Sequence, residues 1–243
     1  MEKLSSSQLK WIKSLHQQKF RRQEQKFIIE GEKMVEEALK EKPQSIEMIV
    51  GKSDWWDKNK INYQGFLASE KEMERISTMS TPPSVLAVLK FLPLTALKKA
   101  PITLVLDGIR DPGNLGTIIR TADWYGIQQI VCSEDTVELY NSKTLQATMG
   151  SFLRVELHYE DIKYFLEEQN NPIIGTILNE DAIDLKQLNI ESELILVMGS
   201  ESHGIRPEIL PLITHPTFIK GKGKAESLNV GIATGICLSH LTK

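Results

Sequence analysis

The sequence contains few cysteines and none of the spacings that bind zinc or carry out dithiol redox chemistry. Only Cys132 and Cys237 occur among the 243 residues. They are far apart, and neither belongs to a CxxC pair or a His/Cys cluster. We therefore predict two buried thiols and no bound metal.

Long apolar runs are missing as well. No stretch approaches the roughly 20 apolar residues that a membrane-spanning helix requires. The opening residues MEKLSSSQLK contain no apolar stretch like that of a signal peptide. We expect a cytoplasmic protein without a membrane partner. A hydrophobic content of 41% suffices for one large domain or two ordinary ones.

The chain also has little excess charge, with a formal net charge of -3. This argues against a protein that coats nucleic acid by bulk electrostatics, although a local basic surface remains open. Residues 1–26 carry seven Lys or Arg against two Glu. Such a cluster either neutralises RNA phosphates, with steep salt dependence, or forms a solvated helix face. Charge alone does not decide between the two.

A short Pro- and Lys-containing segment, LPLTALKKAP at 92–101, separates two strand-like apolar runs. We predict a linker there, between a domain of residues 1–91 and a domain of residues 102–243. In the first domain, apolar residues at helical spacing alternate with strand-like runs. Ser69 and Glu72 form a capping-box signature before a helix. This pattern predicts a small α/β domain.

The second domain shows the pattern of a parallel sheet covered on both faces. Its strand-like runs are residues 102–106, 129–132, 173–177, 194–198 and 215–219, and its predicted helices include 114–125, 160–169 and 227–241. In open α/β sheets, ligands bind outside the carboxyl ends of the strands. The loops that follow the strands are therefore the places to look for function.

Three segments have a strand followed by such a loop. In ITLVLDGIRDPGNLGTIIRTADWYGI (102–127), Asn114 stands at a helix start and Arg120 follows six residues later. The residues alone favour an N-cap and a surface cation. In LILVMGSESHGI (194–205), Gly199 and Gly204 permit either close approach of a ligand or a tight turn. His203 in the same loop is interpreted as a bystander.

The third segment, IKGKGKAESLNVGIATGICL (219–238), begins with Gly and Lys and ends in a helix of small residues that must pack closely. It lacks the GxxxxGK[ST] spacing of an NTPase loop. No GxGxxG follows the first strand of either domain, so a dinucleotide enzyme receives little support.

Together these segments resemble the three motifs of the SpoU (TrmH-like) family of RNA 2'-O-methyltransferases, in the SPOUT superfamily. DPGNLGTIIRTA resembles motif 1, LVMGSESHGI motif 2 and ESLNVGIATGICL motif 3, in the order of the family. FIIEGEKMVEEAL and TPPSVLAVLK are similar to the family's L30e-like substrate-binding domain. The resemblance covers nearly the whole chain.

The resemblance implies an α/β fold with a C-terminal trefoil knot, a homodimer, and S-adenosyl-L-methionine as methyl donor. In that family the donor is held largely by backbone groups of the second and third motif loops, which implies Gly199, Ile219 and Leu228 here. Thr176, at the end of the strand IIGT, is implied as a further wall of the pocket.

For catalysis, a ribose hydroxyl must lose its proton as it attacks the methyl group. The family assigns this role to the motif 1 arginine, here Arg120. Because a free guanidinium stays protonated at neutral pH, a general base and an electrostatic clamp both stay open. Asn114, Glu201, Ser227 and Asn229 match the remaining polar positions and would orient Arg120, the ribose or the loops. Ser227 and Asn229 could instead cap the last helix.

The chain departs from many relatives after the isoleucine that opens motif 3, where it has IKGKGKAESLN in place of a proline and a methionine. Lys220, Lys222 and Lys224 are either extra phosphate contacts or a solvated loop. The substrate-binding domain favours structured ribosomal RNA, 23S-like, as substrate. The alternatives are tRNA, or a non-catalytic RNA-binding assembly factor, against which the intact Arg120, Glu201 and Asn229 speak.

Overall fold

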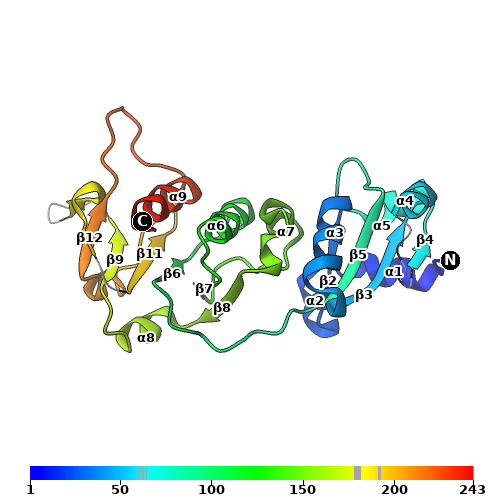
Figure 1. The fold of residues 1–243 in the computed structure, drawn as a ribbon, viewed down its shortest axis with the longest axis horizontal. Helices are drawn as coiled ribbons and strands as arrows, with labels where there is room; N and C mark the ends of the chain where they lie inside the picture. Colours follow the sequence, from blue (N-terminus) through cyan, green and yellow to red (C-terminus); the bar gives the residue numbers. More distant parts are fainter. Residues whose placement is uncertain (60, 62, 64, 178–181, 191–192, 243) are drawn as a thin grey trace. The chain divides into compact units, whose positions relative to one another are not determined.

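The computed structural model describes every residue except 60, 62, 64, 178–181, 191–192 and 243 (Figure 1). The chain forms two compact units. Unit 1 comprises Met1–Pro93 together with Tyr140–Leu153, and unit 2 comprises Leu94–Leu139 and Arg154–Lys243. Neither unit is therefore a continuous stretch of sequence. No helix of the described residues is long and apolar enough to cross a bilayer.

Unit 1 is built on a mixed five-stranded sheet, in which β5 runs antiparallel to both of its neighbours while the other pairs are parallel. In spatial order the strands are β1 (Glu2–Lys3), β4 (Gly65–Leu67), β3 (Ile46–Gly51), β5 (Val85–Lys90) and β2 (Lys26–Glu30). The apolar runs that predicted β3 and β5 are buried along most of their length.

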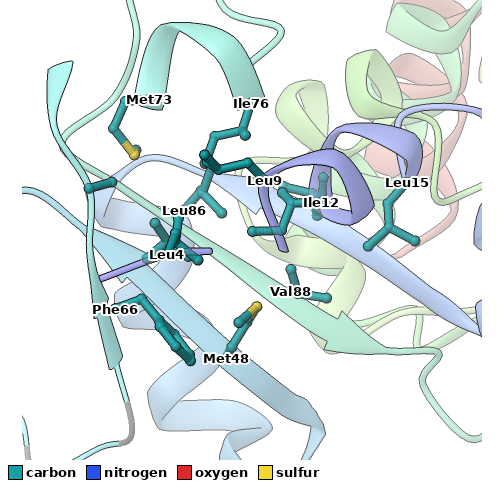
Figure 2. Packing of buried hydrophobic residues seen from close by; sticks show 13 residues of the cluster. Leu4, Leu9, Ile12, Leu15, Met48, Phe66, Met73, Ile76, Leu86 and Val88 are labelled. Atoms are coloured by element: carbon teal, nitrogen blue, oxygen red, sulfur yellow. The ribbon is translucent and has the colours of Figure 1, made fainter. Parts of the chain in front are cut away.

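The helices of unit 1 bury residues against the core. They are α1 (Ser6–Ser14), α2 (Gln18–Glu24), α3 (Glu32–Glu41), α4 (Ser53–Asn59), α5 (Glu70–Ile76) and α7 (Ser142–Thr148), with short 3-10 turns η1 (Pro43–Ser45) and η2 (Ser151–Leu153). Among them, α1, α5 and α7 begin after a capping Ser or Asn. The predicted capping box of Ser69 and Glu72 begins α5. Figure 2 shows Leu9 and Ile12 of α1, and its C-cap residue Leu15, packed in one core with side chains of α5 and the sheet.

Residues 140–153 complete a second part of the unit 1 core. Tyr140 stacks on Phe27 with ring centroids 4.3 Å apart and on Phe91 at 4.2 Å, while Phe152 meets Phe27 edge-on. The Leu92 N–H donates to the Tyr140 hydroxyl at 2.9 Å. Burial raises the pKa of Tyr140 to about 12. The segment is therefore an integral part of unit 1.

Unit 2 contains a seven-stranded sheet in which every pairing is parallel, as the sequence predicts. In spatial order the strands are β10 (Ile183–Asp184), β12 (His215–Phe218), β9 (Ile173–Thr176), β11 (Leu194–Gly199), β6 (Ile102–Asp107), β7 (Gln129–Ser133) and β8 (Glu156–Glu160). Because all strands run in one direction, their carboxyl ends share one edge of the sheet.

The helices of unit 2 lie close to their predicted positions. They are α6 (Pro112–Trp124), α8 (Ile162–Glu167) and α9 (Val230–Leu241), with 3-10 turns η3 (Leu185–Gln187) and η4 (Leu210–Leu212). The N-cap of α6 is Asp111, whose Oδ1 accepts from the Asn114 N–H at 2.8 Å. The interpretation of Asn114 as N-cap was therefore wrong, because the helix begins at Pro112, where a missing N–H costs nothing.

The helices α6 and α9 lie side by side (Figure 1) and pack through small residues. A Cβ added at Gly231 would come within 2.9 Å of Thr117 Cγ2, and one at Gly235 within 3.6 Å of Thr121 Cγ2. This confirms the close packing that the small residues of α9 predict, and it explains why glycines are tolerated within a helix.

Candidate active site

Three of the four residues implied for cofactor binding lie at the carboxyl edge of adjacent strands. Thr176 ends β9, Gly199 ends β11 and Ile219 directly follows β12, and these strands are neighbours in the order β12-β9-β11. Leu228 lies on the loop before α9, with 46% of its surface exposed. The Thr176 hydroxyl has the Met198 thioether, 3.8 Å away, as its partner among the described residues.

The motif 2 loop is a tight turn that depends on both of its glycines. Ser200 and Gly204 exchange two backbone hydrogen bonds of 3.0 and 2.9 Å. Gly204 has a φ of +67°, and a Cβ at Gly199 would lie 2.1 Å from the carbonyl carbon of Gly204. Of the two uses that the sequence left open for these glycines, the turn is visible here.

One polar residue from each motif meets in a single cluster, the Asn114–Glu201–Asn229 cluster. Asn229 Nδ2 donates to Asn114 Oδ1 at 2.7 Å and to Glu201 Oε1 at 2.6 Å. Glu201 Oε1 also accepts from the Val230 N–H at 3.2 Å. Both hydrogens of the Asn229 amide are thus used, and the three motif loops are joined at one point.

Asn229 is at the same time the N-cap of α9. Its Oδ1 accepts from the Gly231 N–H at 3.0 Å and from the Ile232 N–H at 3.3 Å. Capping and cluster formation are therefore not alternatives, because the amide oxygen of Asn229 caps the helix while its amide nitrogen donates to the cluster. Ser227 is exposed, does not cap the helix, and hydrogen bonds through its side chain to none of the described residues.

Arg120 is exposed on α6 and lies outside the cluster. No described residue forms a hydrogen bond or ion pair with its side chain. It follows Asn114 by six residues, which places the two about 120° apart around the helix axis. The structure of this chain thus unites Asn114, Glu201 and Asn229, but not Arg120 or Ser227. Lys220, Lys222 and Lys224 are exposed, without partners among the described residues.

Sequence reasoning missed a charged group beneath the motif loops. Asp107 ends β6 and is buried, and it pairs with Arg206, which follows the motif 2 loop. Asp135 lies nearby: burial raises its pKa, but hydrogen bonds from Ser133 and Arg110 and the charge of Arg206 outweigh this and lower it. The available signal was an acidic residue at the end of a buried apolar strand, just before motif 1.

A cavity of about 920 Å³ lies elsewhere in unit 2, at the amino edge of the sheet. Its walls include the linker residues Leu97–Pro101 and the end of α9, and none of the predicted site residues lines it. The polar cluster, which joins three motifs, is the better candidate site. The described residues contain no group of His, Cys, Asp and Glu suited to holding a metal ion.

Comparisons with known proteins identify the family of each part of the chain. The SpoU rRNA Methylase family matches residues 101–239, and an MRM3-like substrate binding domain matches residues 6–87. The 23S rRNA (guanosine(2553)-2'-O)-methyltransferase RlmP of Bacillus subtilis is 30% identical over 246 residues, covering 99% of this chain and 98% of the relative.

Solved structures show the same fold over nearly the full length. A candidate RNA methyltransferase of the TrmH family from Porphyromonas gingivalis has 35% identity and a TM-score of 0.86, with 98% of each chain covered. An AdoMet-bound rRNA methyltransferase from Sinorhizobium meliloti has 27% identity and a TM-score of 0.86, covering 99% of this chain and 96% of the other. The chain therefore belongs to the SpoU methylase family, with an α/β SPOUT domain preceded by a smaller substrate-binding domain, as its motifs predicted.

Proposed function

We propose that this protein is an S-adenosyl-L-methionine-dependent RNA methyltransferase that methylates a ribose 2'-hydroxyl in 23S-like ribosomal RNA. The observation that carries the proposal is the Asn114–Glu201–Asn229 cluster, in which Asn229 joins all three motifs. Cytoplasmic location follows from the proposed substrate.

The cofactor is proposed to bind at the carboxyl ends of β12, β9 and β11. Backbone N–H and C=O groups at the ends of parallel strands are free to bind a ligand. The Thr176 hydroxyl retains hydrogen-bonding capacity there, and Leu228 offers exposed apolar surface. When bound, S-adenosylmethionine supplies an electrophilic methyl group. Gly199, Ile219 and Leu228 would hold it through their backbones, with Thr176 beside them.

Arg120 is the proposed catalytic cation. An exposed guanidinium without an internal partner can stabilise the negative charge that develops on the ribose oxygen, or hold the neighbouring phosphate. A free guanidinium stays protonated at neutral pH, which favours these roles over that of general base. Asn114, Glu201 and Asn229 orient the loops around the ribose, and Ser227, exposed two residues before Asn229, is free to contact RNA.

The amino-terminal domain is proposed to bind the RNA. We assign residues 1–91, together with the segment 140–153 that packs into unit 1, to substrate binding, 92–101 to the linker and the rest of 102–243 to methyl transfer. The exposed faces of α1 and α2 carry Lys10, Lys13, Lys19 and Arg22. Cations of this kind neutralise phosphates. Ribosomal RNA is favoured over tRNA because RlmP, named for 23S rRNA, matches nearly the whole chain.

A homodimer is proposed through α6 and α9. These paired helices expose large apolar side chains, namely Trp124 at 84%, Ile232 at 56% and Ile236 at 38%. Apolar surface of this kind is typical of an interface. We expect the double variant Ile232→Lys/Ile236→Lys to be monomeric by light scattering, while Leu94→Lys, at another exposed apolar position, stays dimeric. A monomeric wild-type protein would contradict this part of the proposal.

Methyl transfer is tested with purified protein, methyl-labelled S-adenosylmethionine and total RNA from cells that lack the protein. We expect label in a 2'-O-methyl nucleotide of ribosomal RNA. Arg120→Ala should abolish transfer while RNA binding persists, and Lys163→Ala, at an exposed cation on α8, should have no effect. Label confined to tRNA would support the tRNA alternative. RNA binding without label or cofactor uptake would support an assembly factor.

A further inference from the structure

Asp107 and Arg206 form a two-point contact beneath the motif loops. Asp107 is the last residue of β6 and lies directly opposite Gly199 in the β6–β11 ladder. Its Oδ1 accepts from Arg206 Nε at 2.5 Å, and its Oδ2 accepts from the Arg206 backbone N–H at 2.8 Å. The carboxylate thus binds both the side chain and the main chain of one residue.

This contact closes the base of the motif 2 loop. The loop leaves the sheet after Gly199, turns through the Ser200–Gly204 hydrogen bonds, and returns at Arg206. Glu201, inside that turn, accepts from Asn229. Asp107 therefore fixes the return point of the same loop whose other end carries Gly199 and whose tip reaches the cluster.

Stability alone is a poor explanation for this ion pair. The Asp107 side chain is fully buried while that of Arg206 is 38% exposed, so the pair bears the desolvation cost of the carboxylate, which offsets much of the attraction. What the pair adds is geometry, because a carboxylate held at both oxygens restricts both the position and the orientation of Arg206.

The surroundings supply a matched control. Arg206 Nη1 also lies 3.9 Å from Asp135, and Arg206 Nε lies 3.8 Å from Glu208. Asp135 in turn pairs with Arg110 at 3.1 Å, and the Arg110 side chain is 75% exposed. Arg110 is thus a second arginine of the same charge network that does not contact Asp107.

We propose that Asp107 and Arg206 are positioning residues, which hold the motif 2 loop in register with β6 so that Gly199 and Glu201 are in place before cofactor and RNA bind. The inference rests on the proposed function. Neither residue acts on the reacting atoms, and both act through the loop.

The test measures S-adenosylmethionine affinity by calorimetry, kcat and KM of methyl transfer, and the melting temperature. The variants are Asp107→Asn, Arg206→Gln, their double variant, Arg206→Lys and Arg110→Gln. We expect each of the first two to weaken cofactor affinity of the folded protein by about 10- to 100-fold, since small misplacements have large effects. The double variant should be no worse than the worse single variant, because the two residues act as one unit.

Arg206→Lys keeps the positive charge and should recover part of the cofactor affinity that Arg206→Gln loses. Arg110→Gln should bind cofactor like wild type. A lowered melting temperature with wild-type affinity and kcat in Asp107→Asn would show a purely structural role and overturn the inference. Additive losses in the double variant would also overturn it. If the wild-type protein takes up no cofactor, the proposed function and this inference fail together. If the wild-type protein binds the cofactor, the variants test the inference alone.

Discussion

The two sheets of this protein differ in where their polar side chains meet. In unit 1, where strands run in both directions, these groups stabilise local structure. Glu30 accepts from the Thr78 N–H at 3.2 Å and the Thr78 hydroxyl at 2.8 Å, which fixes the loop after α5. Arg21 donates to the carbonyls of Leu15 and His16 at the end of α1. Each of these contacts stabilises one loop or helix end within unit 1.

In unit 2 the polar groups gather at one edge. Asn114 and Asn229 are 115 positions apart in the sequence, yet they are hydrogen bonded because all seven strands end at the same side. A parallel sheet thus collects loops from distant parts of the chain, whereas a mixed sheet divides them between two edges. We therefore expect substitutions in unit 2 loops to affect chemistry, and substitutions in the unit 1 core to affect stability.

Within the Asn114–Glu201–Asn229 cluster, the largest effect is expected at Asn229, where capping and cluster formation can be separated. Asn229→Ser keeps a side-chain acceptor for the cap but loses the two donated hydrogen bonds. We expect kcat to fall about 100-fold or more through misplacement of the loops, with little change in melting temperature. Asn229→Ala should lose the same activity and in addition about 1 kcal/mol of stability. Wild-type kcat in the Ser variant would show that Asn229 is only a cap.

Substituting one glycine by alanine in each unit tests the comparison directly. In Gly199→Ala the new Cβ would lie 2.1 Å from Gly204 backbone, and in Gly65→Ala it would lie 2.1 Å from the Trp56 ring. We expect Gly199→Ala to lose cofactor binding by calorimetry. Gly65→Ala should bind cofactor normally but lose about 1–3 kcal/mol in denaturant unfolding, as overpacked cores do. Equal effects of both on cofactor binding would contradict the separation of roles.

The basic surface of α1 and α2 should change RNA binding without changing chemistry at saturating RNA. The test variant replaces four exposed cations by Gln: Lys10, Lys13, Lys19 and Arg22. The matched control replaces four other exposed cations of unit 1: Lys33, Lys40, Lys71 and Arg75. We expect the salt dependence of RNA affinity, log Kd against log salt, to flatten by about 3 in the test variant only. Equal slopes in both variants would indicate a solvated helix face.

The smallest effect concerns the thiols of unit 2. Burial raises the pKa of Cys132 far above its usual range and that of Cys237 to about 12. Iodoacetamide at about pH 8 should therefore modify neither thiol in the folded protein and both after unfolding. Because the folded pKa values are raised, stability should also decline as pH rises above the ordinary thiol pKa of about 8.5. Rapid labelling of the native protein would contradict the burial.

Much of the fold could be predicted because it depends on local patterns. Alternating apolar runs predicted the parallel sheet, and Ser69 with Glu72 predicted the start of α5. The motifs identified Asn114, Glu201 and Asn229, which the structure brings together. The roles of Arg120, Ser227 and the cofactor-contact residues stay predictions, since they concern groups that contact RNA or ligand and not one another.

The sequence by itself determined most of the elements, the parallel character of the larger sheet and the motifs of the family, because periodicity, caps and glycine turns are encoded within a few neighbouring residues. The strands β8 and β10 and the helix α7 were not predicted. Tertiary structure alone decided that residues 140–153 belong to unit 1, through the stacking of Tyr140 on Phe27. It also decided that Asp107 holds Arg206, a residue 99 positions away. Such contacts join residues with no local relation, and only the packing of the whole chain brings them within hydrogen-bonding distance.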